Sequence, residues 1–267
     1  MRLWERASRW ALAVMIACAA ITVATGLGQA GVYDGRYAWS IAGDLAKGFL
    51  GTAVLAAAVV PVGFALGFLV GWGRTTRSWL ARSAATAYVE FFRGMPPLVL
   101  IVFSSLSAAV LFRRYFYVED PFLASLALGV LALGFHSGGY QAEIIRAGIQ
   151  SVPRGQVEAA YAMGLTPWQT LLSVVMPQAF RVSLPALGNE FSSVIKDTAL
   201  LSAISAVELS YVASLFARDA LTINLRLVII PWLEAAILYF ALTFLVIRTV
   251  KAVENRVKVP GLEAPSL

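Results

Sequence analysis

Polar and ionisable side chains stand inside stretches of this sequence that are otherwise apolar. The candidates are Glu90, Arg93, Glu190, Lys196, Asp197 and Thr198. An ionised group at bilayer depth costs ~2.5 kcal/mol or more unless it is paired or faces a polar cavity. These residues can therefore join helices through hydrogen-bonded networks, or they can line a polar path that meets the charged groups of a solute. The sequence leaves both interpretations open.

The first charged pair is followed by residues that disrupt helices. Glu90 and Arg93 are three residues apart, which places them on one face of a helix. The sequence GMPP at 94–97 comes directly after them and predicts a kink or a break, because proline lacks the N–H of a helical hydrogen bond. An ion pair that braces the kink is one interpretation, and a gate or cavity lining is the other. Glu143 and Arg146 repeat the spacing, and we interpret them as structural.

The apolar segment at 183–208 carries more polar groups than a lipid-facing helix tolerates. Its Lys196 and Asp197 are adjacent, so their side chains point in different directions and do not form a simple helical pair. We expect this segment to face the interior of a bundle, a second copy of the chain or a polar path. His136, in the stretch GFHSGG, is interpreted as a hydrogen-bonded packing residue rather than a proton relay.

Several kinds of chemistry are excluded by what the sequence lacks. The single cysteine, Cys18, and the single histidine, His136, exclude an internal disulfide and a histidine-rich metal centre. The chain has no G-x-x-x-x-G-K-[ST] phosphate loop and no G-x-S-x-G sequence. We therefore expect no catalytic residues, no metal site and no cofactor in this chain, and no nucleic-acid partner.

The elements that position these residues are expected to be membrane helices. Hydrophobic residues make up 59% and charged residues 13% of the 267 positions, against about 45–50% and about 25% in soluble domains. The sequence predicts an all-α integral membrane protein surrounded by lipid. Six stretches are long enough to cross a bilayer, near residues 10–28, 48–72, 84–112, 121–147, 183–208 and 228–250. The first resembles a signal peptide, but its poor cleavage pattern favours a retained helix.

Basic residues predict the orientation. Lys and Arg are concentrated on the side that holds both termini and an insert at 148–182, and such loops face the cytoplasm. Residues 1–47 are expected to hold the first helix and an external loop. A five-helix core is expected at 48–250, followed by a cytoplasmic tail at 251–267.

The insert predicts two short helices rather than one long helix, because prolines recur through it. The first helix is expected to start at Pro153 and to stop at Gly164, a residue type favoured after a helix end. The second has Thr166 as N-cap and Gln169 three residues on, the arrangement of a capping box. Together they predict a compact, exposed knob, although a helix pair lying on the lipid surface is an alternative.

The knob carries a known pattern. The sequence EAAYAMGLTPWQTLLSVVMP resembles the EAA loop of ABC importer permeases, in which E-A-A, Gly and a final Pro follow at set spacings. The matching positions here are Glu158, Ala159, Ala160, Gly164 and Pro177. The stretches EFFRGMPPLVL, GYQAEIIRAGIQSVPRGQ and NEFSSVIKDTALLSAISAVEL look like the polar amino-acid branch of that family. The chain departs from it at Met95, Pro97 and Ala199, and in the additional first helix.

The resemblance implies a function. The chain would be a permease subunit in a bacterial inner membrane, paired with a second copy or a related permease. Its knob would dock on a separate ATPase subunit, which binds ATP and Mg²⁺, and an extracytoplasmic binding protein would deliver an amino acid. The coupling residues implied are Arg154, Glu158, Ala159, Ala160 and Gly164, and the helix at 183–208 would line the pathway.

Two other classes of membrane protein are alternatives. An ion-coupled secondary transporter fits the composition, but such carriers show inverted repeats with broken helices in matching positions, and we find none. A membrane-embedded enzyme would need a histidine cluster, a nucleophile sequence or a catalytic pair of carboxylates, and the sequence offers none of these. The secondary transporter is the alternative that remains.

Overall fold

The computed structural model describes residues 33–117 and 120–257. The helices in chain order are α2 Gly35–Gly73, α3 Trp79–Gly94, α4 Pro97–Tyr115, α5 Phe122–Gln150, α6 Arg154–Ala162, α7 Pro167–Thr170, α8 Met176–Asp197, α9 Leu209–Ile223 and α10 Ile229–Val257. Within the described residues, five helices are long and apolar enough to cross a membrane. The helix expected at 10–28 lies outside the described residues. The all-α membrane fold is confirmed.

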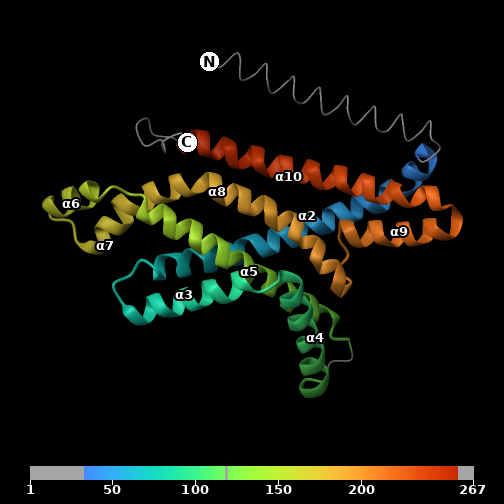
Figure 1. The fold of residues 1–267 in the computed structure, drawn as a ribbon, viewed down its shortest axis with the longest axis horizontal. Helices are drawn as coiled ribbons and strands as arrows, with labels where there is room; N and C mark the ends of the chain where they lie inside the picture. The colour runs from blue at the N-terminus through green and yellow to red at the C-terminus, as the bar shows by residue number, and fades with distance from the viewer. Residues whose placement is uncertain (1–32, 118–119, 258–267) are drawn as a thin grey trace, which may run out of the picture.

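The bundle is organised around α5, which packs along α2 over much of its length. Small residues allow this close approach: a Cβ added at Gly67 would lie 2.5 Å from the Cβ of Gln141. On its other faces α5 meets α4, α3 and α8. α6 and α7 project from one end of the bundle and α9 lies at the opposite end (Figure 1). We call the end of the bundle that carries α6 and α7 the loop end, and the opposite end the α9 end.

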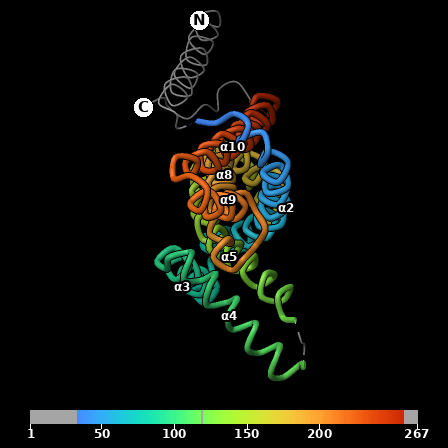
Figure 2. Tube along the Cα trace, turned by 90° about the vertical axis from the view of Figure 1, so that its right-hand side faces the viewer, coloured from blue at the N-terminus to red at the C-terminus, as the bar shows by residue number. Residues whose placement is uncertain are grey.

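The helix expected at 84–112 is two helices. α3 ends at Gly94, α4 begins at Pro97, and the residues between them are extended, because the Pro96 and Pro97 nitrogens carry no hydrogen for a helical ladder. α4 then runs away from α2, α8 and α10, as the second view shows (Figure 2), and packs against α5. The predicted break at 94–97 is confirmed.

Two boundaries from the sequence are wrong. α2 starts at Gly35, not near residue 48, because the Asp34 side chain caps it by accepting hydrogen bonds from the backbone N–H groups of Arg36 and Tyr37. The sequence also predicted no helix between the spans expected at 183–208 and 228–250, where α9 lies. The Glu208 side chain caps α9 in the same way. Short-range caps thus place helices where hydropathy alone showed none.

The insert is also more continuous than expected. α7 passes through a π-helical turn, Leu171–Val175, directly into α8, so the second short helix is the beginning of a long one. Pro177 does not interrupt it because it falls in the first turn after the π-turn, where a missing N–H is tolerated. The helix changes at Asp197 into a 3-10 segment, Thr198–Ile204, and turns at Ser205, whose φ is 62°.

Candidate functional sites: a polar cavity and a projecting loop

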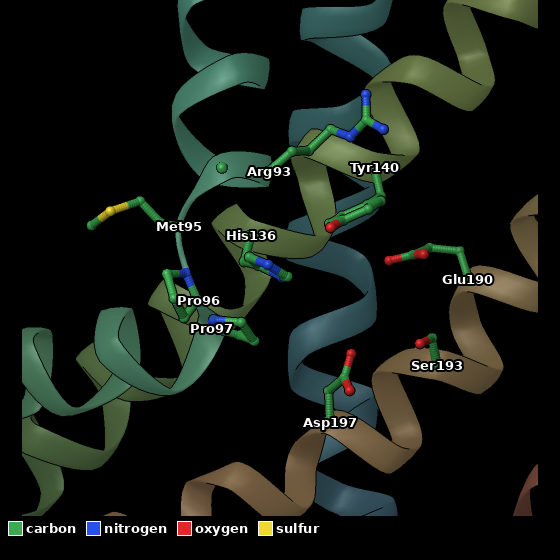
Figure 3. Close-up of a pocket in the computed structure, with 10 residues that line it drawn as sticks. Arg93, Met95, Pro96, Pro97, His136, Tyr140, Glu190, Ser193 and Asp197 are labelled. Carbon is green, nitrogen blue, oxygen red and sulfur yellow. The ribbon is translucent and has the colours of Figure 1, made fainter.

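A cavity of about 520 Å³ opens beside the break between α3 and α4. The residues that line it are Arg93, Gly94, Met95, Pro96, Pro97, His136, Tyr140, Glu190, Ser193 and Asp197. They come from the end of α3, the α3–α4 break, the middle of α5 and the second half of α8. Figure 3 shows the side chains of α5 and α8 facing one another across this space, with Met95 pointing away from it.

The three α8 side chains share one helix face. Glu190, Ser193 and Asp197 follow at intervals of three and four residues, which align on a helix. On α5, His136 and Tyr140 are four residues apart for the same reason, with ring centroids 5.3 Å apart. Helical periodicity on two facing helices therefore gathers these polar groups.

Hydrogen bonds and ring contacts hold part of the lining. The Arg93 guanidinium lies over the Tyr140 ring, 5.1 Å from its centroid, a favourable cation–π geometry. The Ser137 hydroxyl donates to Glu190 Oε1 at 2.8 Å. Among the described residues no ion pair joins Arg93 to Glu190 or Asp197. The cavity thus presents one cationic and two acidic side chains that do not pair with one another.

The cavity brings together only some of the predicted pathway residues. Arg93, Glu190 and Asp197 line it, whereas Glu90 and Lys196 are exposed and lie outside the lining. Thr198 is fully buried, and its hydroxyl donates to the Ile195 carbonyl at 2.7 Å. Glu90 and Arg93 do not form the ion pair that their spacing allowed, because Arg93 turns to Tyr140.

The sequence analysis missed two features of the cavity. Tyr140 was not singled out, and His136 was interpreted as a packing residue, although it borders the cavity while only 8% exposed. Their spacing of four residues in an apolar helix was a usable signal. The sequence alone, however, does not show which face of that helix meets the other polar residues.

The projecting loop, which contains α6 and α7 and connects α5 to α8, holds the residues predicted to couple the chain to an ATPase. Arg154, Glu158, Ala159 and Gly164 are exposed on or beside α6, while Ala160 is 1% exposed. Ala160 therefore packs within the loop, and its part in coupling stays a prediction. Gly164 has φ 82°, a left-handed conformation that favours glycine, so the predicted sharp turn is confirmed.

Short-range and tertiary contacts both fix this loop. The capping box of Thr166 and Gln169 is present. The Trp168 ring packs on Trp72 of α2 with centroids 5.8 Å apart. α6 begins one residue later than expected, after Pro153. The loop is thus a defined shape seated on the end of the bundle.

An ion cluster lies near the loop end of α5. Glu143 pairs with both Arg74 and Arg146, and Arg74 immediately follows α2. Glu143 and Arg146 form the predicted same-face pair, and Arg74 extends it to a second helix. The cluster ties α2 to α5 close to where α5 enters the loop, which agrees with the structural interpretation.

A buried carboxyl group outside the cavity also escaped the sequence analysis. Glu208 is fully buried and accepts hydrogen bonds from the backbone N–H groups of Ser210 and Tyr211 at 3.0 and 2.7 Å. The hydroxyls of Thr52, at 3.4 Å, and Tyr239 also donate to it. This cluster joins α2, α9 and α10.

In the part of the chain that the structure describes, no group of three or more His, Cys, Asp or Glu side chains is placed so that it could hold a metal ion.

A membrane bundle with a polar cavity and a loop seated on its end defines a solute-transport component. A family model described as "Binding-protein-dependent transport system inner membrane component" matches residues 63–259. The chain belongs to this family, and it is a multi-pass membrane protein.

Curated relatives agree with this assignment. The chain is 38% identical over 198 residues to the L-cystine transport system permease protein of Bacillus subtilis, covering 73% of this chain and 78% of the relative. It is 35% identical over 188 residues to the nopaline transport system permease protein of Agrobacterium fabrum, covering 66% and 78%. For the glutamine transport system permease protein of Escherichia coli, the identity is 32% over 197 residues, covering 74% and 85%.

Solved structures share the fold. A crystal structure of an amino acid ABC transporter with histidines matches with a TM-score of 0.69 and 29% identity, covering 84% of this chain and 99% of that chain. An inward-facing methionine ABC transporter matches with a TM-score of 0.66 at 20% identity, covering 81% and 97%, which shows the fold alone. These proteins are ABC transporter components, so the secondary-transporter alternative finds no support.

Proposed function

We propose that this chain is the permease subunit of an ATP-driven importer for amino acids, and that it couples a polar pathway to separate ATPase subunits. One observation carries the proposal. The projecting loop is continuous at its two ends with α5 and α8, and these same two helices form facing walls of the polar cavity. A force on the loop therefore acts directly on the walls of the cavity.

The projecting loop would dock on the ATPase. Glu158 and Ala159 are exposed and offer a carboxylate beside a small surface that allows close approach. Arg154 adds a cation, and Gly164 fixes the turn. ATP and Mg²⁺ would be bound by that partner, and this chain would hold no catalytic site. Rigid-body movement of the loop would then alternate access to the cavity.

The cavity supports a substrate class. An amino acid carries a carboxylate that matches Arg93 and an ammonium group that matches Glu190. Asp197 remains as a second acidic group, about two helical turns from Glu190 along α8. This lining favours an amino acid whose side chain is cationic over one that is acidic. The names of the relatives, which include cystine, glutamine and nopaline systems, support an amino acid or a related compound.

The full assembly would contain two permeases, either two copies of this chain or this chain and a related permease. An extracytoplasmic binding protein would deliver the solute at the α9 end. The loop end and both termini would lie on the cytoplasmic side of a bacterial inner membrane, in contact with its lipid. The distribution of Lys and Arg supports this orientation.

Crosslinking tests the docking. In a Cys18→Ala background, Ala159→Cys should form a crosslink to a nucleotide-hydrolysing subunit in the active complex. Thr222→Cys is the control, because Thr222 is equally exposed but lies on α9 at the opposite end. Absence of any ATPase crosslink from Ala159→Cys would overturn the proposed coupling.

Uptake by the reconstituted complex tests the substrate class. Asp197→Asn should lower uptake of arginine or lysine about tenfold or more, since a hydrogen bond to a charged group is worth about 1.5–3 kcal/mol, with a smaller effect on glutamine. Lys196→Ala is the matched control, because Lys196 is adjacent but exposed outside the cavity, and uptake should stay within about twofold. Equal losses for arginine and glutamine would refute the cationic preference.

A further inference from the structure

α5 and α8 lead from the projecting loop to the cavity, and they make a very close contact with one another between the loop and the cavity. Gly148 is buried in α5, and a Cβ added there would lie 2.0 Å from Ser183 Oγ and 2.8 Å from the Ala179 carbonyl oxygen. Gly148 lies within α5 and outside the left-handed region, so glycine is needed there for space and not for conformation. The Ser183 hydroxyl donates to the Ile144 carbonyl at 3.3 Å.

The contact between α5 and α8 changes in character toward the cavity. At Gly148 the helices touch backbone to side chain with no space between them. At the cavity they are joined by a hydrogen bond from Ser137 to Glu190, of 2.8 Å, at the edge of a cavity of about 520 Å³. α5 and α8 are thus packed tightly at Gly148 and are joined by one hydrogen bond beside open space at the cavity. This arrangement allows the two helices to rotate relative to one another about the tight contact.

We propose that the Gly148–Ser183 crossing is the pivot about which α5 and α8 rotate when the projecting loop is displaced. In this proposal Gly148 and Ser183 position α5 and α8 relative to one another and do not contact the substrate. This inference rests on the proposed function, because it assumes that the loop is moved by an ATPase. It adds the place where the movement of the loop becomes a change in the cavity.

The dimensions make a small rotation sufficient. Ser137 lies about 16 Å from Gly148 along α5, at 1.5 Å per residue. A rotation of about 10° at the crossing displaces Ser137 by about 3 Å, which breaks its hydrogen bond to Glu190 and widens the cavity. The ion cluster of Glu143 with Arg74 and Arg146 lies on the cavity side of the pivot, so α2 is carried with α5.

A change of volume at the crossing tests the pivot. In the reconstituted transporter, Gly148→Ala should lower uptake per ATP hydrolysed about tenfold, because the new methyl group meets Ser183 Oγ. Adding Ser183→Ala removes that oxygen and should recover at least a third of the lost uptake. The matched control is Gly134→Ala, which also crowds α5 but against Val62 of α2, at 2.7 Å. It should leave uptake per ATP within about threefold.

Accessibility of the cavity gives a readout that simple destabilisation does not reproduce. In a Cys18→Ala background, Ser193→Cys should react with a membrane-impermeant maleimide at a rate that changes when ATP is added. Gly148→Ala should abolish this change, and the double variant with Ser183→Ala should restore it. A Gly148→Ala protein that still switches would overturn the pivot, as would a Gly134→Ala protein that loses switching equally.

Covalent links keep the inference testable even where Gly148→Ala does not assemble. A short thiol-to-thiol linker between Ile144→Cys and Ser183→Cys joins two points at the pivot and should leave ATP-dependent labelling unchanged. The same linker between Ser137→Cys and Glu190→Cys joins the moving ends and should stop it. The opposite pattern overturns the pivot alone. A wild-type complex that binds no ATPase overturns the proposed function itself.

Discussion

Glu190 and Glu208 are both carboxyl groups withdrawn into the same bundle, yet their surroundings differ. Glu208 is fully buried and accepts from four donors, two backbone N–H groups and the hydroxyls of Thr52 and Tyr239. Glu190 is half-buried, borders the cavity and accepts one hydrogen bond, from Ser137. The same chemical group thus has four protein donors in one place and one in the other.

The number of donors around each carboxyl group suggests a structural role for Glu208 and a role in transport for Glu190. A buried polar group costs free energy unless it is hydrogen-bonded, so Glu208 is best explained as a tie between three helices. Glu190 borders a cavity, where, under the proposed function, a cationic group of the substrate would complete its bonding. The two residues thus differ both in burial and in the number of their donors.

Glu208→Ala should have the largest effect on folding. It leaves two backbone N–H groups and two hydroxyls without their acceptor, and each unsatisfied buried group costs about 1–3 kcal/mol. We expect a loss of about 3 kcal/mol or more in the free energy of unfolding, seen as a large fall in Tm in detergent. A Tm within a degree or two of the wild type would contradict the structural role.

Gly51→Ala should have an intermediate effect on the same region. The added Cβ would lie 2.2 Å from the Val207 carbonyl oxygen, next to Glu208, and overpacking costs about 1–3 kcal/mol. Gly43→Ala is the matched control on the same helix, since nothing lies within 4 Å of its added Cβ. It should be neutral or stabilising by up to about 1 kcal/mol, and equal Tm values for the two variants would contradict the close contact.

Glu190→Gln should have the smallest effect on stability and a large effect on transport. The glutamine oxygen can still accept from Ser137, so we expect a change in unfolding free energy below about 1 kcal/mol. Uptake of a cationic amino acid should fall about tenfold, because the acidic partner of its ammonium group is gone. A destabilisation as large as that of Glu208→Ala would remove the distinction between the two carboxyl groups.

The loop was predictable because its determinants are local. Thr166 and Gln169 form their capping box within four residues, and Gly164 adopts its left-handed turn through its own backbone. The break at 94–97 followed from proline chemistry in the same way. The continuity of α7 with α8 was missed because a π-turn before Pro177 accommodates the proline, and proline count alone does not reveal such a turn.

The cavity was only partly predictable. Ionisable residues in apolar segments marked Arg93, Glu190 and Asp197 as important, but Lys196 and Glu90 satisfied the same criterion and lie outside the cavity. The faces of α5 and α8 that meet are selected by packing, through contacts such as Gly148 against Ser183. Glu208 was not noticed, since its donors Thr52 and Tyr239 come from distant parts of the sequence.

The amino-acid sequence by itself determined the membrane-spanning class, the break between α3 and α4, and the turn at Gly164 and the capping box of the projecting loop. These depend on hydropathy, proline geometry and capping, which act within a few residues. The tertiary structure decided which carboxyl group joins three helices and which one lines the cavity, and where α5 and α8 cross. Those outcomes depend on hydrogen-bond partners and interhelical space supplied by segments far away along the chain.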